Sequence, residues 1–195
     1  MVFRSSGWGL MLTVGLVVEG IYDEAALKEL IQKCAPSGTQ VISRPCGSRE
    51  KLMRMFPGIL EDFRHAKNGS HVDKAIVIRD ADNKNAAELI KRMEAKVFNR
   101  NYPFHKNLLV AVQQLEAWLL ADESAISAVT GKKITRVQNP ENLRDPKERL
   151  NRLLSEAKSS YTPEVARKIA ASAKLETIEF RCPSFKKFRE AVVDC

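Results

Sequence analysis

Acidic residues follow three apolar stretches of this sequence, and their types and spacing suit a site for a hard metal ion. The candidate ligands, in chain order, are Glu19, Asp23, Asp80, Asp82 and Glu116. Two carboxylates held close together repel each other and raise one pKa, unless a cation lies between them. Because the candidates offer only oxygen ligands, with no His or Cys among them, they favour Mg²⁺ or Mn²⁺ over zinc.

Such an ion would give the site a defined chemistry. A divalent cation can bridge phosphate oxygens, orient a water molecule and stabilise charge in phosphoryl transfer. Asp80 and Asp82 are two residues apart after an apolar run, and extended geometry would point both side chains to one side. The spacing therefore predicts that this pair acts together.

The elements that position these acids follow from the hydrophobic pattern. Apolar, β-branched runs predict strands at residues 11–18, 39–43, 74–79 and 107–112. Apolar residues at helical spacing predict helices at residues 23–33, 49–67, 85–97 and 114–129. This alternation predicts an α/β fold with a parallel or mostly parallel four-strand sheet covered by helices. Ligands of such sheets bind outside the carboxyl ends of the strands, where the acids fall.

Two residues affect how the helix predicted at residues 49–67 should begin and continue. Ser48 is placed to cap its N-terminus, and Pro57 lies inside its apolar stripe. Proline removes a backbone donor and clashes with the preceding turn, so we expect it to kink or split the helix.

The predicted alternation of strands and helices ends after Gly131. Three further helices are predicted at residues 146–157, 163–173 and 183–193, each opening near a proline. We therefore divide the chain into an α/β core at residues 11–130 and a basic helical extension at residues 131–195 that packs on the core.

The charge balance points to a polyanionic partner. The net charge is +8, and most of the excess falls in the extension. Such a surface attracts DNA or RNA, although a solvated basic region of an ordinary protein is an equal alternative. Arg44 and Arg49 flank the end of the second predicted strand, and Lys132 and Lys133 open the extension. These four residues are our candidates for nucleic-acid contacts.

The remaining reactive residue types do not form a second site. The cysteines Cys34, Cys46, Cys182 and Cys195 form no CxxC pair and no zinc-ligand spacing. We expect reduced thiols in a cytoplasmic protein, and no apolar run reaches the length of a transmembrane helix. The histidines, which we expect to be surface or structural residues, are His65, His71 and His105.

The acidic motifs resemble those of a known fold. Val18-Glu19-Gly20, Ile78-Arg79-Asp80-Ala81-Asp82 and the later Glu116 are similar to the pattern of Toprim domains, found in topoisomerases, primases and OLD-family nucleases. This resemblance implies that the glutamate and the DxD pair organise Mg²⁺, and that the glutamate acts as general acid or base. The EGxxD form with a later glutamate is similar to the OLD-type arrangement, which implies two metals.

A narrower resemblance covers about residues 11–193. The string LEAWLLAD, the segment from Pro140-Glu141 to Asp145-Pro146-Lys147, and the closing RCPSF resemble the signature of the DUF4276 family of Toprim-like proteins. Members of such families are often paired with ATPases in antiphage systems, which implies an ATPase partner. OLD-type nucleases also place a lysine shortly after the last glutamate, whereas residues 117–131 contain neither Lys nor Arg. Arg79 or Lys106 could replace it in space.

Our leading hypothesis is a Mg²⁺- or Mn²⁺-dependent nuclease or phosphotransfer domain that acts on nucleic acid. Glu19, Asp80 and Asp82 would hold the first metal and carry the catalysis, while Asp23 and Glu116 would bind a second metal or orient the site. The alternative is a non-catalytic module that binds metal, nucleic acid or an ATPase, which the missing lysine favours. A small-molecule phosphate enzyme lacks support, because the sequence has no glycine-rich phosphate loop.

Overall fold

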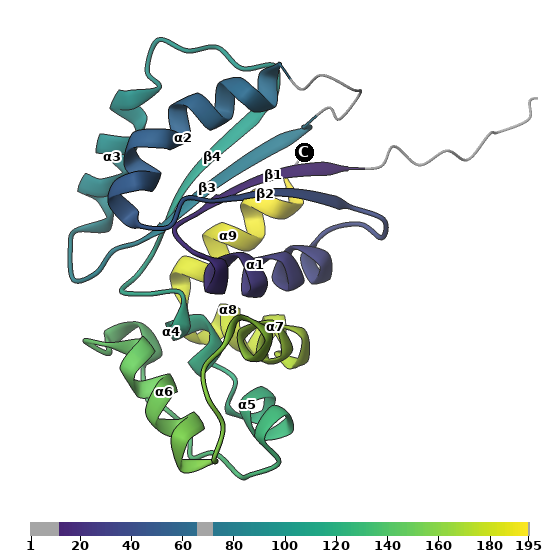
Figure 1. Ribbon diagram of the computed structural model, residues 1–195, viewed down its shortest axis with the longest axis vertical. Coiled ribbons are helices and arrows are strands. Elements are labelled where there is room, and N and C mark those ends of the chain that lie inside the picture. Colours follow the sequence, from purple (N-terminus) through teal and green to yellow (C-terminus); the bar gives the residue numbers. More distant parts are fainter. Residues whose placement is uncertain (1–11, 66–71, 195) are drawn as a thin grey trace, which may run out of the picture.

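A computed structural model of the chain describes residues 12–65 and 72–194 and has the predicted α/β fold (Figure 1). Its four-stranded sheet is parallel throughout, in the order β2-β1-β3-β4. The strands are β1 (Thr13–Val18), β2 (Gln40–Pro45), β3 (Lys74–Asp80) and β4 (His105–Ala111). The predicted strands are thus confirmed to within a few residues at their ends.

The strand order follows from the apolar runs. β1 is buried along its whole length and β3 is buried except at its last residue, as expected for strands that are covered on both faces. β2 and β4 form the two edges and are more exposed. The two central strands therefore carry the sheet, and the acids that follow them are held at its centre.

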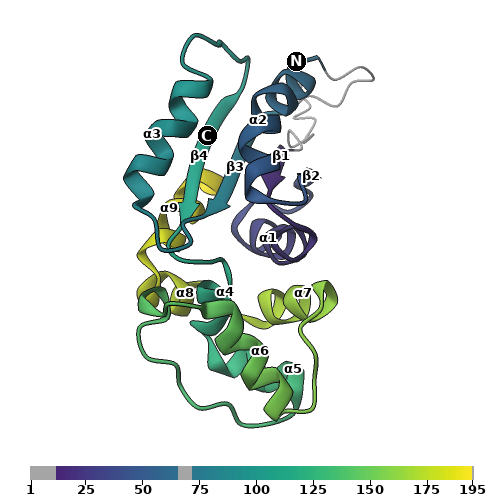
Figure 2. The same ribbon diagram turned by 60° about the vertical axis from the view of Figure 1, so that its left-hand side comes forward.

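Helices cover both faces of the sheet (Figures 1 and 2). On one face, α1 (Ile21–Cys34) and α9 (Pro183–Val193) pack on a cluster that includes Leu16 of β1. On the other face, α2 (Arg49–Arg64) and α3 (Ala86–Lys96) pack on a cluster that includes Val17. Adjacent residues of β1 thus belong to opposite cores, because side chains alternate along a strand.

α2 continues through Pro57 as one helix, so the predicted split does not occur. Ser48 caps this helix as expected, since its side chain accepts a hydrogen bond from Lys51 N at 3.2 Å. Pro57 itself is buried on the apolar stripe.

The single helix predicted at residues 114–129 is wrong. The chain instead forms α4 (Glu116–Leu120) and α5 (Glu123–Thr130), separated at Asp122. The buried Asp122 side chain accepts hydrogen bonds from Ser124 N at 3.0 Å and from Lys174 N at 2.8 Å. A side chain that caps a new helix and binds a distant backbone ends the first helix at this point.

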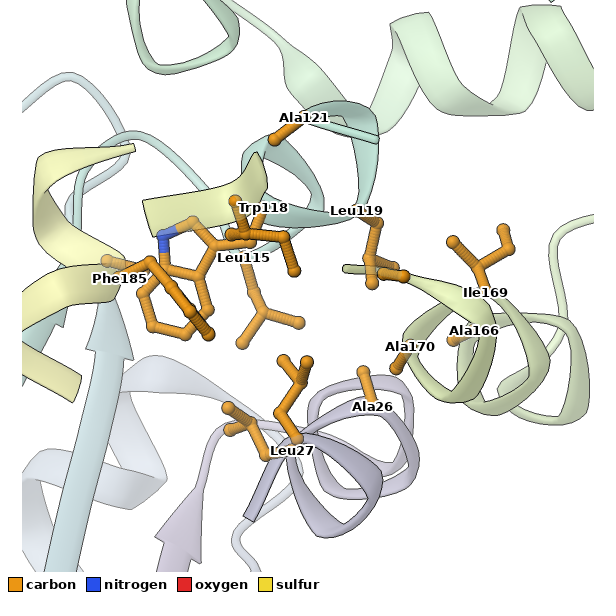
Figure 3. Close-up of a cluster of buried hydrophobic side chains, with 14 of the residues drawn as sticks. Ala26, Leu27, Leu115, Trp118, Leu119, Ala121, Ala166, Ile169, Ala170 and Phe185 are labelled. Carbon is orange, nitrogen blue, oxygen red and sulfur yellow. The ribbon is translucent and has the colours of Figure 1, made fainter. Parts of the chain in front are cut away.

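The C-terminal helices share a core with the sheet. The predicted α6 (Pro146–Glu156), α7 (Pro163–Ser172) and α9 are present, together with two unpredicted elements, η1 (Pro140–Asn142) and α8 (Leu175–Arg181). Figure 3 shows Leu27 of α1, Trp118 of α4, Ile169 of α7 and Phe185 of α9 in one buried cluster. This packing holds the C-terminal helices against the carboxyl edge of the sheet.

Candidate active site

Glu19 and Asp23 are held where β1 turns into α1. Gly20 is the N-cap of α1, and Asp23 Oδ2 accepts a hydrogen bond from Gly20 N at 2.9 Å. Glu19 Oε1 accepts one from Asp80 N at 3.0 Å, and Arg79 Nε lies 3.9 Å from the same oxygen. The end of β1 is therefore tied to the end of β3 through the Glu19 carboxylate.

Asp80 and Glu116 are brought together by a second tie. Asp80 Oδ1 accepts a hydrogen bond from Leu115 N at 2.9 Å, which attaches the start of α4 to the end of β3. Glu116 begins α4, and its side chain is only 3% exposed. The predicted convergence of acids from three strand ends is what this geometry produces for Glu19, Asp23, Asp80 and Glu116, all of which line one cleft of about 460 Å³.

The carboxylates of this cleft destabilise one another when ionised. Burial raises the pKa of Asp80 well above its usual value, and the charges of Asp23 and Glu116 raise it further. Burial, then the Glu116 charge, raises the pKa of Asp23 to about 7, although the Gly20 N–H opposes the change. Burial also raises the pKa of Glu116, against the effect of a nearby lysine. The cleft therefore favours a proton or a cation.

That lysine is Lys147, which our reading of the sequence did not place in the site. Lys147 N donates to the side-chain Oε1 of Gln114 at 2.9 Å, so the start of α6 is attached to the segment after β4. Its Nζ lies 3.7 Å from Glu116 Oε1 and 5.0 Å from the ring centroid of Tyr22, and the side chain is 47% exposed. A lysine from another helix, α6, thus lies beside Glu116.

Tyr161 also belongs to this site and has no signal in the sequence. Its hydroxyl is buried, and burial and the Glu116 charge raise the pKa of the phenol well above its usual value. The Tyr161 ring lies 5.0 Å, centroid to centroid, from that of Tyr22, which lines the cleft. The loop before α7 therefore brings Tyr161 against Tyr22 and close to Glu116.

Asp82 does not share an extended geometry with Asp80, so that expectation is wrong. β3 ends at Asp80, and Asp82 has a left-handed backbone with φ of 48°. Its Oδ2 accepts a hydrogen bond from Arg49 at 2.6 Å, beside the cleft. The Asp82 charge still reaches the site, because it raises the pKa of Asp80 and of Glu19.

The candidate nucleic-acid residues fall in different places. Arg49 lies beside the acids through its ion pair with Asp82, whereas the guanidinium of Arg44 lies 5.9 Å from the ring centroid of Phe63. Lys132 Nζ donates to Glu156 O at 3.0 Å, at the end of α6 opposite to Lys147. At a rise of 1.5 Å per residue, the two ends of α6 are about 15 Å apart. The exposed Lys133 follows Lys132, so this pair lies well away from the cleft.

Of the two suggested replacements for the missing lysine, the structure brings only one near the acids. Arg79 is buried beside Glu19 and donates to Asp80 O at 3.2 Å. Lys106 lies near the start of β4, at the far end of the strand from the cleft, with its Nζ 5.7 Å from the ring centroid of Tyr102. Arg79 therefore supports Glu19, and Lys147 is the exposed cation of the cleft.

The donor set fits a hard divalent cation held in an open site. Within residues 12–65 and 72–194, no three Asp, Glu, His or Cys side chains are arranged to enclose a metal ion. Mg²⁺ commonly uses only one or two carboxylates, together with waters and substrate phosphates. The cleft offers buried carboxylate oxygens and a repulsion that a cation would relieve. The chemistry of these donors thus suits a hard cation, whereas the described side chains do not by themselves enclose one.

Other expected features have these positions. Cys34, Cys46 and Cys182 are free thiols, and His65 and His105 are exposed. Cys195 and His71 lie outside the described residues. In the part of the chain that the structure describes, no helix is long and apolar enough to cross a membrane.

Comparison with known proteins identifies one family. The family described as "Domain of unknown function (DUF4276)" matches residues 18–192 of the chain. The match begins at the end of β1 and includes every acid of the cleft, Lys147 and Tyr161. No curated protein and no solved structure gives a significant match.

Proposed function

The chain belongs to the DUF4276 family, and from the geometry of its cleft we propose that it is a Mg²⁺- or Mn²⁺-dependent nuclease or phosphotransfer domain acting on DNA or RNA. One observation carries the proposal. Asp23, Asp80 and Glu116 converge in one cleft where ionisation of each is unfavourable. A divalent cation bound among these carboxylates would relieve their repulsion.

We assign the following metal-binding and phosphate-binding roles to the residues of the cleft and its surroundings. Asp80 with Glu19 would hold a first ion, and Asp23 with Glu116 would hold a second or orient the first. The ion would stabilise the charge that develops on a phosphate during transfer. Lys147, half-exposed at the mouth of the cleft, would bind a phosphate oxygen. Arg49 could exchange Asp82 for a phosphate, which would free Asp82 as a further ligand.

We extend the proposal to a relationship with Toprim domains. Its support is the placement of the motifs, with Glu19 directly after β1 and Asp80 at the end of the adjacent β3. Lys147 adds support, because its ammonium lies near Glu116 and could take the place of the lysine that is missing from the sequence after this residue. Glu19, whose pKa is raised by burial, is our candidate for the general acid or base.

Calorimetric titration with Mn²⁺ and Mg²⁺ tests the metal site. We expect saturable binding to the wild-type chain and its loss in Asp80→Ala. Asp62→Ala is the matched control, because Asp62 is an exposed acid on α2 that does not line the cleft. Absence of binding to the folded wild-type chain would remove the basis of the proposal.

A cleavage assay on single-stranded and duplex DNA and RNA tests the reaction. Activity that survives the joint substitution of Asp80→Ala and Asp82→Ala would count against the assignment. Lys147→Ala should weaken cleavage far more than Lys132→Ala, since the two lysines lie at opposite ends of α6. Equal effects of the two substitutions would indicate a diffuse electrostatic contribution rather than a role in the site.

A second candidate is a module that binds a cation or nucleic acid without turnover. The observation in its favour is that residues 117–131 contain neither Lys nor Arg, so the chain has no lysine shortly after Glu116 where OLD-type nucleases place one. Metal binding without cleavage, in the presence and absence of an ATPase from the same host, would select this candidate.

The ATPase partner is a proposal that rests on the family resemblance. Affinity purification of the tagged chain from its host, followed by mass spectrometry, tests it. Recovery of an ATPase that is retained in Asp80→Ala would show that the partner binds independently of the metal site.

A further inference from the structure

One face of α3 is exposed beside the free edge of the sheet. Ala87, Lys91, Glu94 and Phe98 are all exposed, and their spacing of four, three and four residues places them on one side of the helix and its following turn. Phe98 is 83% exposed, which is unusual for a large aromatic side chain. Neither Lys91 nor Glu94 forms an ion pair with another described residue.

This face continues into the edge of β4, whose outer side pairs with no other strand of residues 12–65 and 72–194 (Figure 2). A cavity of about 440 Å³ lies between Glu94 and Phe98 on one side and Lys106 to Leu109 on the other. A second cavity, of about 140 Å³, is lined by apolar residues that include Ala86, Ile90 and Val110. Leu109 lines both cavities, so they form one surface along the strand.

We propose that this α3 face binds the same face of a second copy of the chain, with the two α3 helices antiparallel about a two-fold axis. A two-fold interface brings the same patch of both copies together, so the patch must complement itself. The order of residues on α3 meets this condition. When Lys91 of one copy lies opposite Glu94 of the other, Ala87 of the first lies opposite Phe98 of the second.

The two contacts support each other because they share one centre, midway between residues 91 and 94. The ion pair is formed twice, once on each side of the axis, and each large aromatic ring meets a small alanine. Ala87 adjoins Ala86, which lines the smaller apolar cavity. In the dimer, the ring of Phe98 from the second copy would therefore be buried against apolar residues instead of being exposed to water.

The charge pattern selects a second copy over an unrelated protein. A partner of different sequence would need no exchange of Lys91 and Glu94 about a single point. Free strand edges invite association with another chain, and proteins often protect them with charged side chains or proline. Here the face carries one positive and one negative residue, so that two copies attract each other.

Sedimentation velocity over a range of chain concentrations tests the dimer. We expect the wild-type chain to dimerise and Phe98→Asp to weaken the dimer roughly thirtyfold, as for loss of an aromatic hot spot. The matched control is Phe180→Asp, because Phe180 is 85% exposed but lies on α8. A wild-type chain that stays monomeric, or equal effects of the two substitutions, would overturn the proposal.

Charge exchange tests the geometry of the pairing. Lys91→Glu alone and Glu94→Lys alone should each weaken the dimer, because each places like charges opposite one another. The double variant should restore wild-type affinity. Since both residues are exposed, circular dichroism should show an unchanged fold in every variant. Failure of the double variant to recover dimerisation would exclude this antiparallel arrangement, even if another dimer forms.

Discussion

The two ends of β3 each hold a charged side chain, and the groups that surround the two charges differ in kind. At the start, Lys74 is only 2% exposed, and its Nζ donates to Val192 O at 2.8 Å, to Ala191 O at 3.3 Å and to Asp194 O. At the other end, Asp80 lies among carboxylates that raise its pKa. One strand thus carries a compensated charge and an uncompensated charge.

The difference separates a structural charge from a functional one. The ammonium of Lys74 lies at the C-terminus of α9, where backbone carbonyls lack partners and the helix dipole is negative. The cost of burying the Lys74 charge is then offset by hydrogen bonds that also satisfy the last carbonyls of α9. At Asp80 the neighbouring carboxylates add repulsion, so the cost of the Asp80 charge is offset only when a proton or a ligand binds. Uncompensated burial is therefore the physical mark of the candidate site.

Removing the compensated charge should have the largest effect on stability. Lys74→Met should lower the free energy of unfolding by about 3 kcal/mol, because the carbonyls that end α9 lose a charged donor. Urea denaturation measures the change. Lys33→Met is the control, since Lys33 donates to Ala171 O at 2.7 Å at the end of α7 but is exposed. An equal loss in both variants would show that burial does not matter.

The uncompensated acids should make stability depend on pH. The pKa of Asp23 is about 7 in the folded chain and 3.8 when unfolded, so the folded state binds the proton more tightly. The contribution of this group to stability is then greatest below about pH 4 and is lost as pH rises through 7, falling by about 2 kcal/mol between pH 5 and pH 7. Denaturation of the metal-free chain across this window measures the slope. Asp23→Asn should flatten it, and a rise in stability with pH from this group would contradict the assignment.

Neutralising Asp80 should change the stability in the opposite direction to the substitution of Lys74. Asp80→Asn keeps an oxygen for Leu115 N and removes a repelling charge, so the metal-free chain should gain on the order of 1 kcal/mol at neutral pH. Thermal denaturation with and without Mn²⁺ measures both states. The wild-type chain should be stabilised by Mn²⁺, and the variant should not. A destabilised variant would mean that the Asp80 charge is compensated after all.

Lys147 should matter least for stability. Its side chain is half-exposed, so Lys147→Met should change the free energy of unfolding by less than about 1 kcal/mol. The change should also raise the pKa of Glu116 further, since Lys147 lowers it. NMR titration of the Glu116 carboxyl would detect this increase. No movement of that pKa would show that the lysine does not act on the acids.

Much of the fold could be predicted from local pattern. The buried runs of β1 and β3, the caps and the proline-opened helices are local signals, and the structure has each of them. The acids after β1, β3 and β4 were predicted to converge because parallel strands end at one edge. Three local inferences failed. The split expected at Pro57 does not occur, and those at Asp122 and Asp82 failed because each side chain binds a partner distant in sequence, Lys174 or Arg49.

The sequence by itself determined which strands form the sheet and which acids stand at their ends, since hydrophobic period and strand direction are properties of short segments. Only the tertiary structure decided how that edge is completed. α6 brings Lys147 to Glu116, and the loop before α7 brings Tyr161 beside it, over separations that no spacing rule links. The reason is that these groups are positioned by the packing of α4, α6 and α7, and such packing depends on the complementarity of surfaces distant in sequence.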